Sequence, residues 1–299
     1  MTYAIIDIGS NSMRLTVYEA ENRNFKILFK EKIMAGLAGY VENGLLSQEG
    51  ITRACTALLE FKNTLELLNI TEKIFIFATA SLRNVINTDE AVAKITALTG
   101  FEIDVITGNQ EAMFGYEGAM CELSVNDGAF VDIGGASTEM TILKKGTFSF
   151  SNSWRLGSLK LYKDCVRKII PGENSVKRIQ NEICSEMPEH IFESFSPQDQ
   201  LICMGGTARS VIKIAKHLSL ISDTENSVSR EQFNEIGKLL LSNKKTAADI
   251  ILKVDPARIH TIIPGYLILQ YISQQLKIKK LTVSNYGVRE GYLCRKVLL

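Results

Sequence analysis

Four apolar segments of the chain end in glycine, serine, threonine or asparagine. They are "DIGSNS" (7–12), "ATASLR" (78–83), "DIGGAST" (132–138) and "MGGTARS" (204–210). Glycine lets the backbone approach a ligand, and successive backbone N–H groups and hydroxyls can form a concave array of donors that suits phosphate. Any one segment could be an ordinary tight turn, but four of them at matching places in the two half-chains predict a phosphate site.

An arginine accompanies two of these segments, "SLR" and "GGTARS". Arginine can grip a phosphate with two parallel hydrogen bonds, so its presence beside the donors strengthens the prediction. None of the segments has the spacing of the Rossmann glycine motif or of the Walker phosphate loop, which disfavours those two kinds of nucleotide site.

Paired carboxylates are expected beside the donors. Ala4–Glu19 aligns without gaps on Ala129–Lys144, and this alignment places Asp7 and Asp132 at equivalent positions of two similar patterns. Each pattern reads as a β-hairpin, and Glu139 would lie on the returning strand, where the hairpin can bring it close to Asp132. Such pairs typically hold Mg²⁺, which keeps several waters and takes its other ligands from substrate phosphates.

Glu111 stands at the start of a predicted helix, just after "VITGN". A carboxylate there could activate water for attack on phosphorus. The helix dipole alone also favours a glutamate in the first turn. Without reference to any known family, the sequence favours this second interpretation, in which Glu111 only stabilises the start of the helix.

The hydrophobic pattern predicts the elements that would carry these groups. Strands are expected at 3–8, 13–19, 24–35, 73–81, 101–107, 129–133, 138–143, 146–153, 200–206 and 280–287. Helices are expected at 47–69, 87–100, 109–123, 157–168, 174–194, 207–218 and 229–252, from Pro264 onward, and at the C-terminus. The order βββαβαβ, given twice, predicts two duplicated α/β domains with a cleft between them, joined at the turn "VNDG" (125–128).

The overall composition limits the number of domains, the kinds of partner and the cellular compartment that we expect. A chain of 299 residues suits two domains, and a net charge of +1 gives no global field that would recruit nucleic acid or an acidic membrane. The six cysteines are scattered without metal-ligand spacing, which is typical of free thiols in a reducing cytoplasm. No signal peptide and no membrane-spanning run is predicted, so the expected location is cytoplasmic.

Together, these segments resemble the exopolyphosphatase and guanosine pentaphosphate phosphohydrolase (Ppx/GppA) family, within the actin-like ATPase, sugar kinase and Hsp70 superfamily. The resemblance runs in the family's order through "DIGSNSMRL", "ATASLRN", "TGNQEA", "DIGGASTE", "RLGSLKL", "GGTARS" and "TVSNYGVREGYL". It implies an α/β fold of two ribonuclease-H-like domains, residues 1–124 and 125–286, that flank a cleft. The helix at 287–299 is expected to pack back on the first domain.

The resemblance also implies roles for single residues. Glu111 matches the general base, and Asp132 and Glu139 match carboxylates that hold a divalent metal, with Asp7 grouped beside them as the equivalent of Asp132. The residues that match phosphate-binding positions are Gly9, Ser10, Asn11, Ser12, Arg83, Gly134, Gly135, Ser137, Thr138, Gly205, Gly206 and Thr207.

Three positions depart from the family pattern. Many relatives carry a second glutamate where this chain has Gln110, a third glycine where it has Ala136, and Asp or Gly where it has Asn285. The retained Glu111 keeps activity open, whereas Gln110 lowers the local charge and the methyl group of Ala136 could narrow the loop. The chain looks like the short, two-domain form of the family.

The predicted activity is Mg²⁺-dependent release of a terminal phosphate from inorganic polyphosphate. Two alternatives stay open: removal of the 5′ γ-phosphate from guanosine pentaphosphate, and non-catalytic sensing of polyphosphate or guanosine tetraphosphate. A small-molecule kinase is disfavoured because the chain has little room for an acceptor insertion. A homodimer stays open as its assembly.

A basic stretch bears on the choice of substrate. Five cations, at Arg155, Lys160, Lys163, Arg167 and Lys168, follow the second hairpin and could hold a long polyanion. A solvated amphipathic helix face would explain them equally well. No segment has the pattern expected of a pocket for a nucleotide base. This favours inorganic polyphosphate over guanosine pentaphosphate as the substrate.

Overall fold

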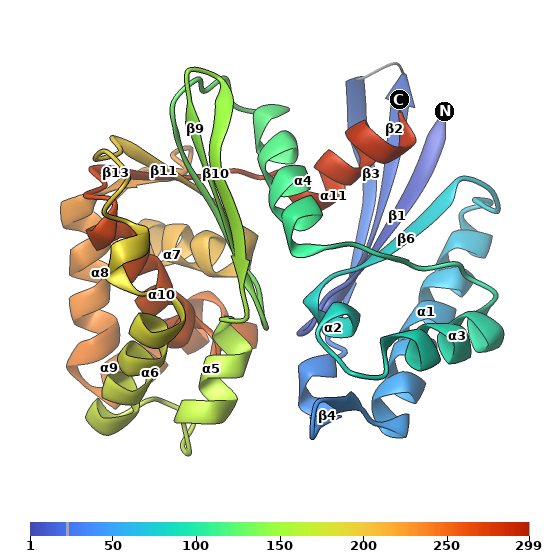
Figure 1. Ribbon diagram of the computed structural model, residues 1–299, viewed down its shortest axis with the longest axis horizontal. Coiled ribbons are helices and arrows are strands. Elements are labelled where there is room, and N and C mark those ends of the chain that lie inside the picture. The colour runs from blue at the N-terminus through green and yellow to red at the C-terminus, as the bar shows by residue number, and fades with distance from the viewer. Residues whose placement is uncertain (22–23, 299) are drawn as a thin grey trace. The chain divides into compact units, whose positions relative to one another are not determined.

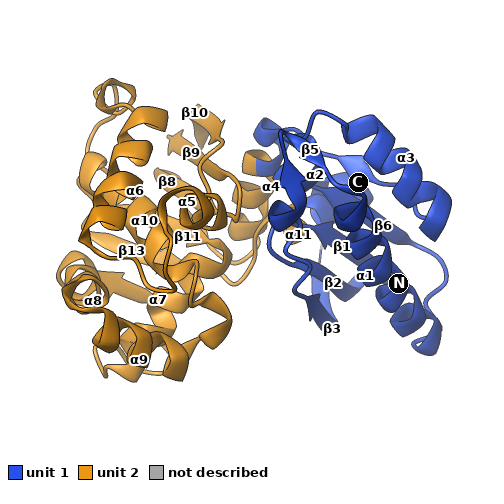
Figure 2. Ribbon diagram, turned by 90° about the horizontal axis from the view of Figure 1, so that it is seen from below, with its two compact units in different colours: residues 1–111, 292–299 blue, residues 112–291 orange. Residues whose placement is uncertain are grey.

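The computed structural model of the chain describes residues 1–21 and 24–298 (Figure 1). Two compact units divide the chain (Figure 2). The first comprises residues 1–111 and 292–299, and the second comprises residues 112–291. No helix within the described residues combines the length and the apolar character needed to cross a bilayer.

The first unit is built on a five-stranded sheet of order β3-β2-β1-β6-β7. Its strands are β1 (Thr2–Ile8), β2 (Met13–Glu21), β3 (Asn24–Ile33), β6 (Ile74–Ala78) and β7 (Asp104–Val105). β1, β2 and β3 form an antiparallel meander, whereas β6 runs parallel to β1 and β7 runs parallel to β6. A separate two-stranded ribbon joins β4 (Val41–Glu42) to β5 (Leu45–Leu46).

Helices α1 (Gln48–Leu67), α2 (Ala80–Arg83) and α3 (Thr88–Thr99) belong to this unit, with a 3₁₀ turn at Leu37–Tyr40. Ser47 caps α1 by accepting a hydrogen bond from the backbone N–H of Gly50. The buried side chains of α1 recur every three or four residues, at Ile51, Ala54, Leu58, Phe61 and Leu65. This spacing gives one apolar face, which lies in the core of the unit.

The second unit repeats the topology in a six-stranded sheet of order β10-β9-β8-β11-β13-β12. Its strands are β8 (Gly128–Ile133), β9 (Thr138–Lys144), β10 (Thr147–Trp154), β11 (Gln200–Met204), β12 (Ser227–Ser229) and β13 (Lys280–Val283). β8 to β10 form the meander, and β11 and β13 continue the sheet in parallel. The edge strand β12 pairs antiparallel with β13.

Eight helices accompany this sheet among the described residues. They are α4 (Gly108–Met120), α5 (Ser158–Cys165), α6 (Glu173–Glu186), α7 (Gly205–His217), α8 (Arg230–Ser242), α9 (Lys244–Val254), α10 (Ile262–Gln275) and α11 (Val288–Tyr292). Helix α10 packs against α5, α6 and α7, and its residues from Ile262 to Leu269 are all buried (Figure 1). Shorter helical turns occur at Glu189–Ile191 and Pro256–Arg258, and a π-helical turn at Leu293–Val297 belongs to the first unit.

The internal repeat of the sequence corresponds to one hairpin built twice. In β1–β2 the register places Asp7 opposite Arg14, and in β8–β9 it places Asp132 opposite Glu139. Because the two hairpins have the same register and the two sheets share the order meander-then-parallel, the predicted duplication of an α/β, ribonuclease-H-like topology is confirmed.

The compact units divide the chain at Glu111/Ala112, ahead of the boundary at 124/125 that the turn signal predicts. Packing explains the difference, because Ala119 and Tyr116 of α4 contact Phe130 in the apolar cluster on the second sheet. At the other end of the chain, the first unit includes residues from Tyr292 onward rather than from 287.

Several predicted elements have different ends. The strand predicted at 73–81 ends at Ala78, because the chain turns there into α2. The strand predicted at 101–107 is reduced to β7, and the helix predicted at 174–194 ends at Glu186. The helical region predicted at 229–252 comprises two helices, α8 and α9. Asn243 separates them, since its side chain accepts a hydrogen bond of 2.8 Å from the Thr246 N–H and so caps α9.

Candidate active site

Loop 1 (residues 9–12) joins β1 to β2. The carbonyl oxygens of Ser10 and Asn11 accept hydrogen bonds, both 2.9 Å long, from backbone N–H groups of the segment 36–38. A trans peptide points its N–H away from its carbonyl. The N–H groups of Asn11 and Ser12 therefore point away from that segment, as a donor array for an anion requires.

Loop 2 (residues 134–137) repeats this construction in the second unit. The carbonyl oxygens of Gly134 and Gly135 accept hydrogen bonds of 2.9–3.0 Å from the first N–H groups of α5. The N–H groups of Gly135 and Ala136 consequently point away from α5. The helix start itself is occupied by these carbonyl groups, so the loop rather than the helix would meet a ligand.

The side chains around loop 2 are less available than its backbone. Thr138 is fully buried, and its hydroxyl donates to the carbonyl oxygen of Leu156, which leaves no phosphate role for that hydroxyl as a donor. Gly157, which sequence reasoning did not single out, is essential to the close docking. A Cβ atom there would lie only 2.3 Å from the nitrogen of Ala136.

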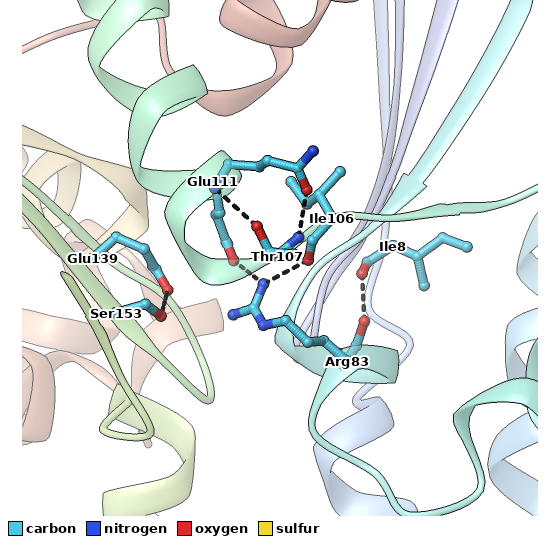
Figure 3. Close-up of polar contacts among 9 residues, drawn as sticks. Ile8, Arg83, Ile106, Thr107, Glu111, Glu139 and Ser153 are labelled. Carbon is cyan, nitrogen blue, oxygen red and sulfur yellow. Dashed lines mark hydrogen bonds and ion pairs between the residues drawn. The ribbon is translucent and has the colours of Figure 1, made fainter. Parts of the chain in front are cut away.

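In the first unit, an ion pair joins Arg83 to Glu111 (Figure 3). The Nη1 atom of Arg83 lies 2.7 Å from Oε2 of Glu111 and 3.1 Å from the carbonyl oxygen of Ile106. Glu111 is only 8% exposed, in the first turn of α4. A buried carboxylate needs such compensation, and the guanidinium group both supplies it and fixes the orientation of the carboxylate.

Arg83 is placed by short local contacts. It ends α2, which follows β6 directly, and the hydroxyl of Ser81 on α2 donates to the carbonyl oxygen of Ile8 at the end of β1 (Figure 3). This bond ties α2 to the edge of the sheet from which loop 1 also starts. Figure 3 accordingly shows Arg83 reaching from α2 to Glu111 and Ile106.

The departure at Gln110 has a structural role. Its side-chain oxygen accepts a hydrogen bond of 2.8 Å from the N–H of Thr107, and the Thr107 hydroxyl accepts one of 3.2 Å from the N–H of Gln110. These reciprocal bonds form a capping box at the start of α4. Gln110 therefore helps to fix the helix turn that presents Glu111.

In the second unit, Asp132 and Glu139 are register partners on β8 and β9, so their side chains lie on the same face of the hairpin. Glu139 is 3% exposed, and the hydroxyl of Ser153 on β10 donates to its Oε1 atom at 2.7 Å (Figure 3). The carboxylate of Asp132 lies at the start of α7. A Cβ atom at Gly205, where φ is +81°, would be 2.3 Å from its Oδ1 atom.

The donor set of this hairpin fits Mg²⁺. No group of three or more His, Cys, Asp or Glu side chains suited to a metal occurs within residues 1–21 and 24–298. Mg²⁺ commonly needs only one or two carboxylates, however, and completes its shell with water and substrate phosphate. Asp7 differs in that its cross-strand neighbour is the cation Arg14, and its place in a metal site stays a prediction.

The third predicted phosphate segment forms the first turn of α7 rather than a loop. A Cβ atom at Gly206 would overlap the guanidinium group of Arg258, so that arginine lies directly on the helix start. The hydroxyl of Thr207 is buried against Gly265, which leaves its backbone N–H as the group that could meet a phosphate.

Two arginines near this turn share an electrostatic environment with Asp132. Burial lowers the pKa of the Arg209 guanidinium, the positive charge of Arg289 lowers it further, and Asp132 opposes the shift. Positive charge is thus concentrated where the helix dipole is also positive. Sequence reasoning missed Arg258, because no nearby motif signals that it would fold over a glycine 52 positions earlier in the chain.

The model of the Ppx/GppA phosphatase family matches residues 16–299. The chain belongs to this family. Among its relatives, a protein of Haemophilus influenzae, whose name as an exopolyphosphatase was assigned by inference, is 26% identical over 97% of this chain and 90% of its own length. A guanosine-5′-triphosphate,3′-diphosphate pyrophosphatase of Vibrio atlanticus is 27% identical over 97% of this chain.

This Ppx/GppA family member spans 58% of the length of the Vibrio protein. A solved exopolyphosphatase of Cytophaga hutchinsonii superposes with a TM-score of 0.85 at 22% identity, covering 98% of this chain and 96% of that one. The superposition shows that the fold is shared. The family match and the fold together agree with a phosphatase built on the two units described above.

Proposed function

We propose that this chain hydrolyses a phosphoanhydride bond and releases the terminal phosphate of inorganic polyphosphate. The observation that carries the proposal is the buried Glu111, held by Arg83 at the start of α4. Burying a carboxylate costs free energy, and carboxylates held in this way are concentrated at functional sites. The relatives named as exopolyphosphatases supply the substrate class.

In the proposed reaction, Glu111 orients a water molecule and accepts its proton as the water oxygen attacks the terminal phosphorus atom. The bond between that phosphorus and the bridging oxygen breaks, and the shortened chain leaves with the bridging oxygen. Arg83 keeps the carboxylate in one orientation, so the accepting oxygen does not need to be ordered during the reaction.

Groups of the second unit are suited to bear charge on phosphoryl oxygens. The N–H groups of Gly135 and Ala136 and the first turn of α7 supply donors, and Arg258 adds positive charge at that turn. Asp132 and Glu139 would hold Mg²⁺, which supplies neutralisation of phosphate charge when it is bound. Ser153 keeps Glu139 oriented for this task.

The setting of the reaction is part of the proposal. The free cysteines among the described residues agree with a reducing compartment, and we place the protein in the cytoplasm. The homodimer stays a prediction.

Phosphate release tests the proposed function directly. Purified protein is given long-chain polyphosphate, guanosine pentaphosphate and ATP in parallel, each with Mg²⁺ and with a chelator. We expect Mg²⁺-dependent release that is fastest from polyphosphate. Faster release from guanosine pentaphosphate would identify that nucleotide as the preferred substrate, in agreement with the name of the Vibrio relative. Tight binding of either ligand without release would identify a sensor.

A further inference from the structure

A basic hollow lies on the second unit, away from loop 2. It has a volume of about 860 Å³ and is formed by the segment after α5, the first turns of α6 and the junction between α8 and α9. Its charged lining residues are Arg167, Lys168, Lys177, Arg178, Lys244 and the single acid Glu173. Five cations against one carboxylate give the hollow a positive potential that favours anions.

Four of the five cations lack a salt bridge among the described residues. Arg167, Lys168, Lys177 and Lys244 are exposed, and none of the four forms an ion pair within the part of the chain that the structure describes. Like charges that outnumber the one carboxylate of the hollow repel one another, which costs stability unless an anion binds between them. The arrangement therefore favours an anionic occupant.

Arg178 is held in place while it keeps its charge. Its Nε and Nη2 atoms donate to the carbonyl oxygen of Cys165, at 3.2 and 2.7 Å, and Nη2 also donates to the hydroxyl of Ser175. All three bonds end on neutral acceptors. A guanidinium group fixed in this way loses little entropy when it meets a phosphate.

The backbone adds to the same field. Helix α6, 14 residues long, begins in the hollow with Gly172 as its N-cap and no side-chain cap. The amino group of Lys244 lies 3.0 Å from the point where a Cβ atom of Gly172 would stand, so side-chain and helix-start charges converge. The end of α8 and the start of α9 also meet here, and their opposite dipoles largely offset each other.

Helix α5 connects this hollow to loop 2. Its first N–H groups hold the carbonyl oxygens of loop 2, and the chain enters the hollow just after its last residue, Cys165. Eight residues of helix span about 12 Å. A short oligophosphate bound at loop 2 would not extend over this length, whereas a long chain would.

We propose that the hollow is a second phosphate site, which binds the distal part of a long polyphosphate chain while its end is processed elsewhere. The proposal rests on the proposed function for its ligand, but the site can be tested by binding alone. Binding at this second site depends on the cations of the hollow and not on the charges of the catalytic residues.

The test neutralises three of the cations, as Arg167→Gln, Lys168→Gln and Lys244→Gln in one chain. The matched control removes three exposed lysines elsewhere, as Lys26→Gln, Lys238→Gln and Lys253→Gln, and so changes the net charge equally. We expect the KM for long-chain polyphosphate to rise roughly tenfold in the test variant only, with the KM for tripolyphosphate and both kcat values unchanged.

Binding gives a second readout that does not depend on turnover. Titration of long-chain polyphosphate into the full chain at several salt concentrations should show a log–log slope shallower by about 2 in the test variant, from about 0.7 per lost contact. If the parent binds in this way but releases no phosphate, the second site stands and the proposed function falls.

Other results would overturn the second phosphate site. Phosphate release by a test variant whose binding and KM match those of the control variant would overturn the second site and leave the proposed function intact. Competition by single-stranded RNA of equal charge as effective as polyphosphate itself would also overturn it, because the hollow would then be a general polyanion surface.

Discussion

Arg83 and Glu111 form an ion pair, and we expect substitution of either residue to affect both the stability of the fold and the rate of the proposed reaction. Their side chains are only 16% and 10% exposed, so removing either partner leaves a charge in a largely water-excluded position. Removing one partner of a buried ion pair typically lowers the free energy of unfolding by several kcal/mol, whereas substitutions that keep the volume of the side chains cost less. Tests of this pair therefore need conservative substitutions and a measurement of folding beside the measurement of rate.

Replacing Glu111 with glutamine keeps the shape of the side chain and removes the proton acceptor. We expect Glu111→Gln to lower kcat by roughly 10²–10⁴-fold while KM changes little. Steady-state phosphate release measures both constants. Glu102→Gln is the matched control, since Glu102 is exposed in the same unit and should leave both constants unaltered. A kcat within a few-fold of the parent would make Glu111 an ordinary helix-start residue.

Replacing Arg83 with lysine keeps the charge but loses the planar group. One Nη1 atom now serves both Glu111 and the carbonyl oxygen of Ile106, and a lysine amine is not rigid enough to hold both in the same geometry. We expect Arg83→Lys to lower kcat on the order of 10²-fold through misplacement of the carboxylate.

The comparison with Arg83→Gln separates positioning from substrate binding. A positioning role lowers kcat in both variants, with partial recovery in the lysine variant. If instead KM alone rises, and kcat is kept, Arg83 contacts the substrate and does not orient the base.

Among the elements, the β8–β9 hairpin carries the proposed metal carboxylates. Asp132→Asn and Glu139→Gln each remove an anionic oxygen from opposite strands of that hairpin. We expect each variant to need a higher Mg²⁺ concentration for half-maximal activity, because neutral amides are poorer ligands for a hard cation. Titration of phosphate release against Mg²⁺ gives the value.

The same hairpin offers its own control. Asp127, next to the far end of β8, accepts a hydrogen bond of 2.8 Å from the N–H of Lys145 and lies at the opposite end of the strand from loop 2. Asp127→Asn should leave the Mg²⁺ requirement unaltered. Unchanged half-saturation in all three variants would remove the metal from this hairpin.

Local pattern was enough to predict the hairpins and the repeat. Register in a hairpin follows from a few neighbouring residues, so the offset between Asp7 and Asp132 and the approach of Glu139 to Asp132 could be read from the sequence. The helical region predicted at 229–252 is confirmed, but its division into α8 and α9 could not be predicted, because the apolar pattern continues through the cap made by Asn243.

Contacts between distant segments could not be predicted in this way. Arg258 reaches Gly206 only because the segment after α9 folds onto the start of α7, and Thr207 is buried by the approach of Gly265 on α10. Each depends on how helices pack on the second sheet. The residue types alone suggested a phosphate loop at 205–207, where the structure has a helix start.

At the scale of the whole molecule, the chain passes from one unit to the other twice, within α4 and at the end of α11. After the second passage, Tyr292 is 4% exposed, and its ring stacks on Phe77 with 4.8 Å between centroids. Its hydroxyl donates to Asp104 at 3.1 Å, and Lys296 contacts the same carboxylate at 3.0 Å. Burial raises the pKa of Tyr292, so the hydroxyl stays protonated as a donor.

Shortening this side chain should unfold the first unit more easily. We expect Tyr292→Ala to lower the free energy of unfolding by about 3–5 kcal/mol, as for other buried aromatic residues, and Tyr292→Phe by about 1.5–3 kcal/mol through the lost hydrogen bond. Urea unfolding followed by the fluorescence of Trp154, which lies in the second unit, and by circular dichroism of the whole chain compares the two units. A loss confined to the Trp154 signal would contradict the assignment of residues 292–299 to the first unit.

The discontinuity of the first unit has a consequence for the order of biosynthesis. Its sheet and α1 are made early, but Tyr292 is added only after the ribosome has completed residues 112–291. At about 5–20 residues per second this interval lasts roughly ten to forty seconds. During that time the second unit is still being synthesised, and the surface around Phe77 lacks its aromatic partner. The nascent first unit would thus expose an apolar surface that chaperones recognise until the second unit has been synthesised.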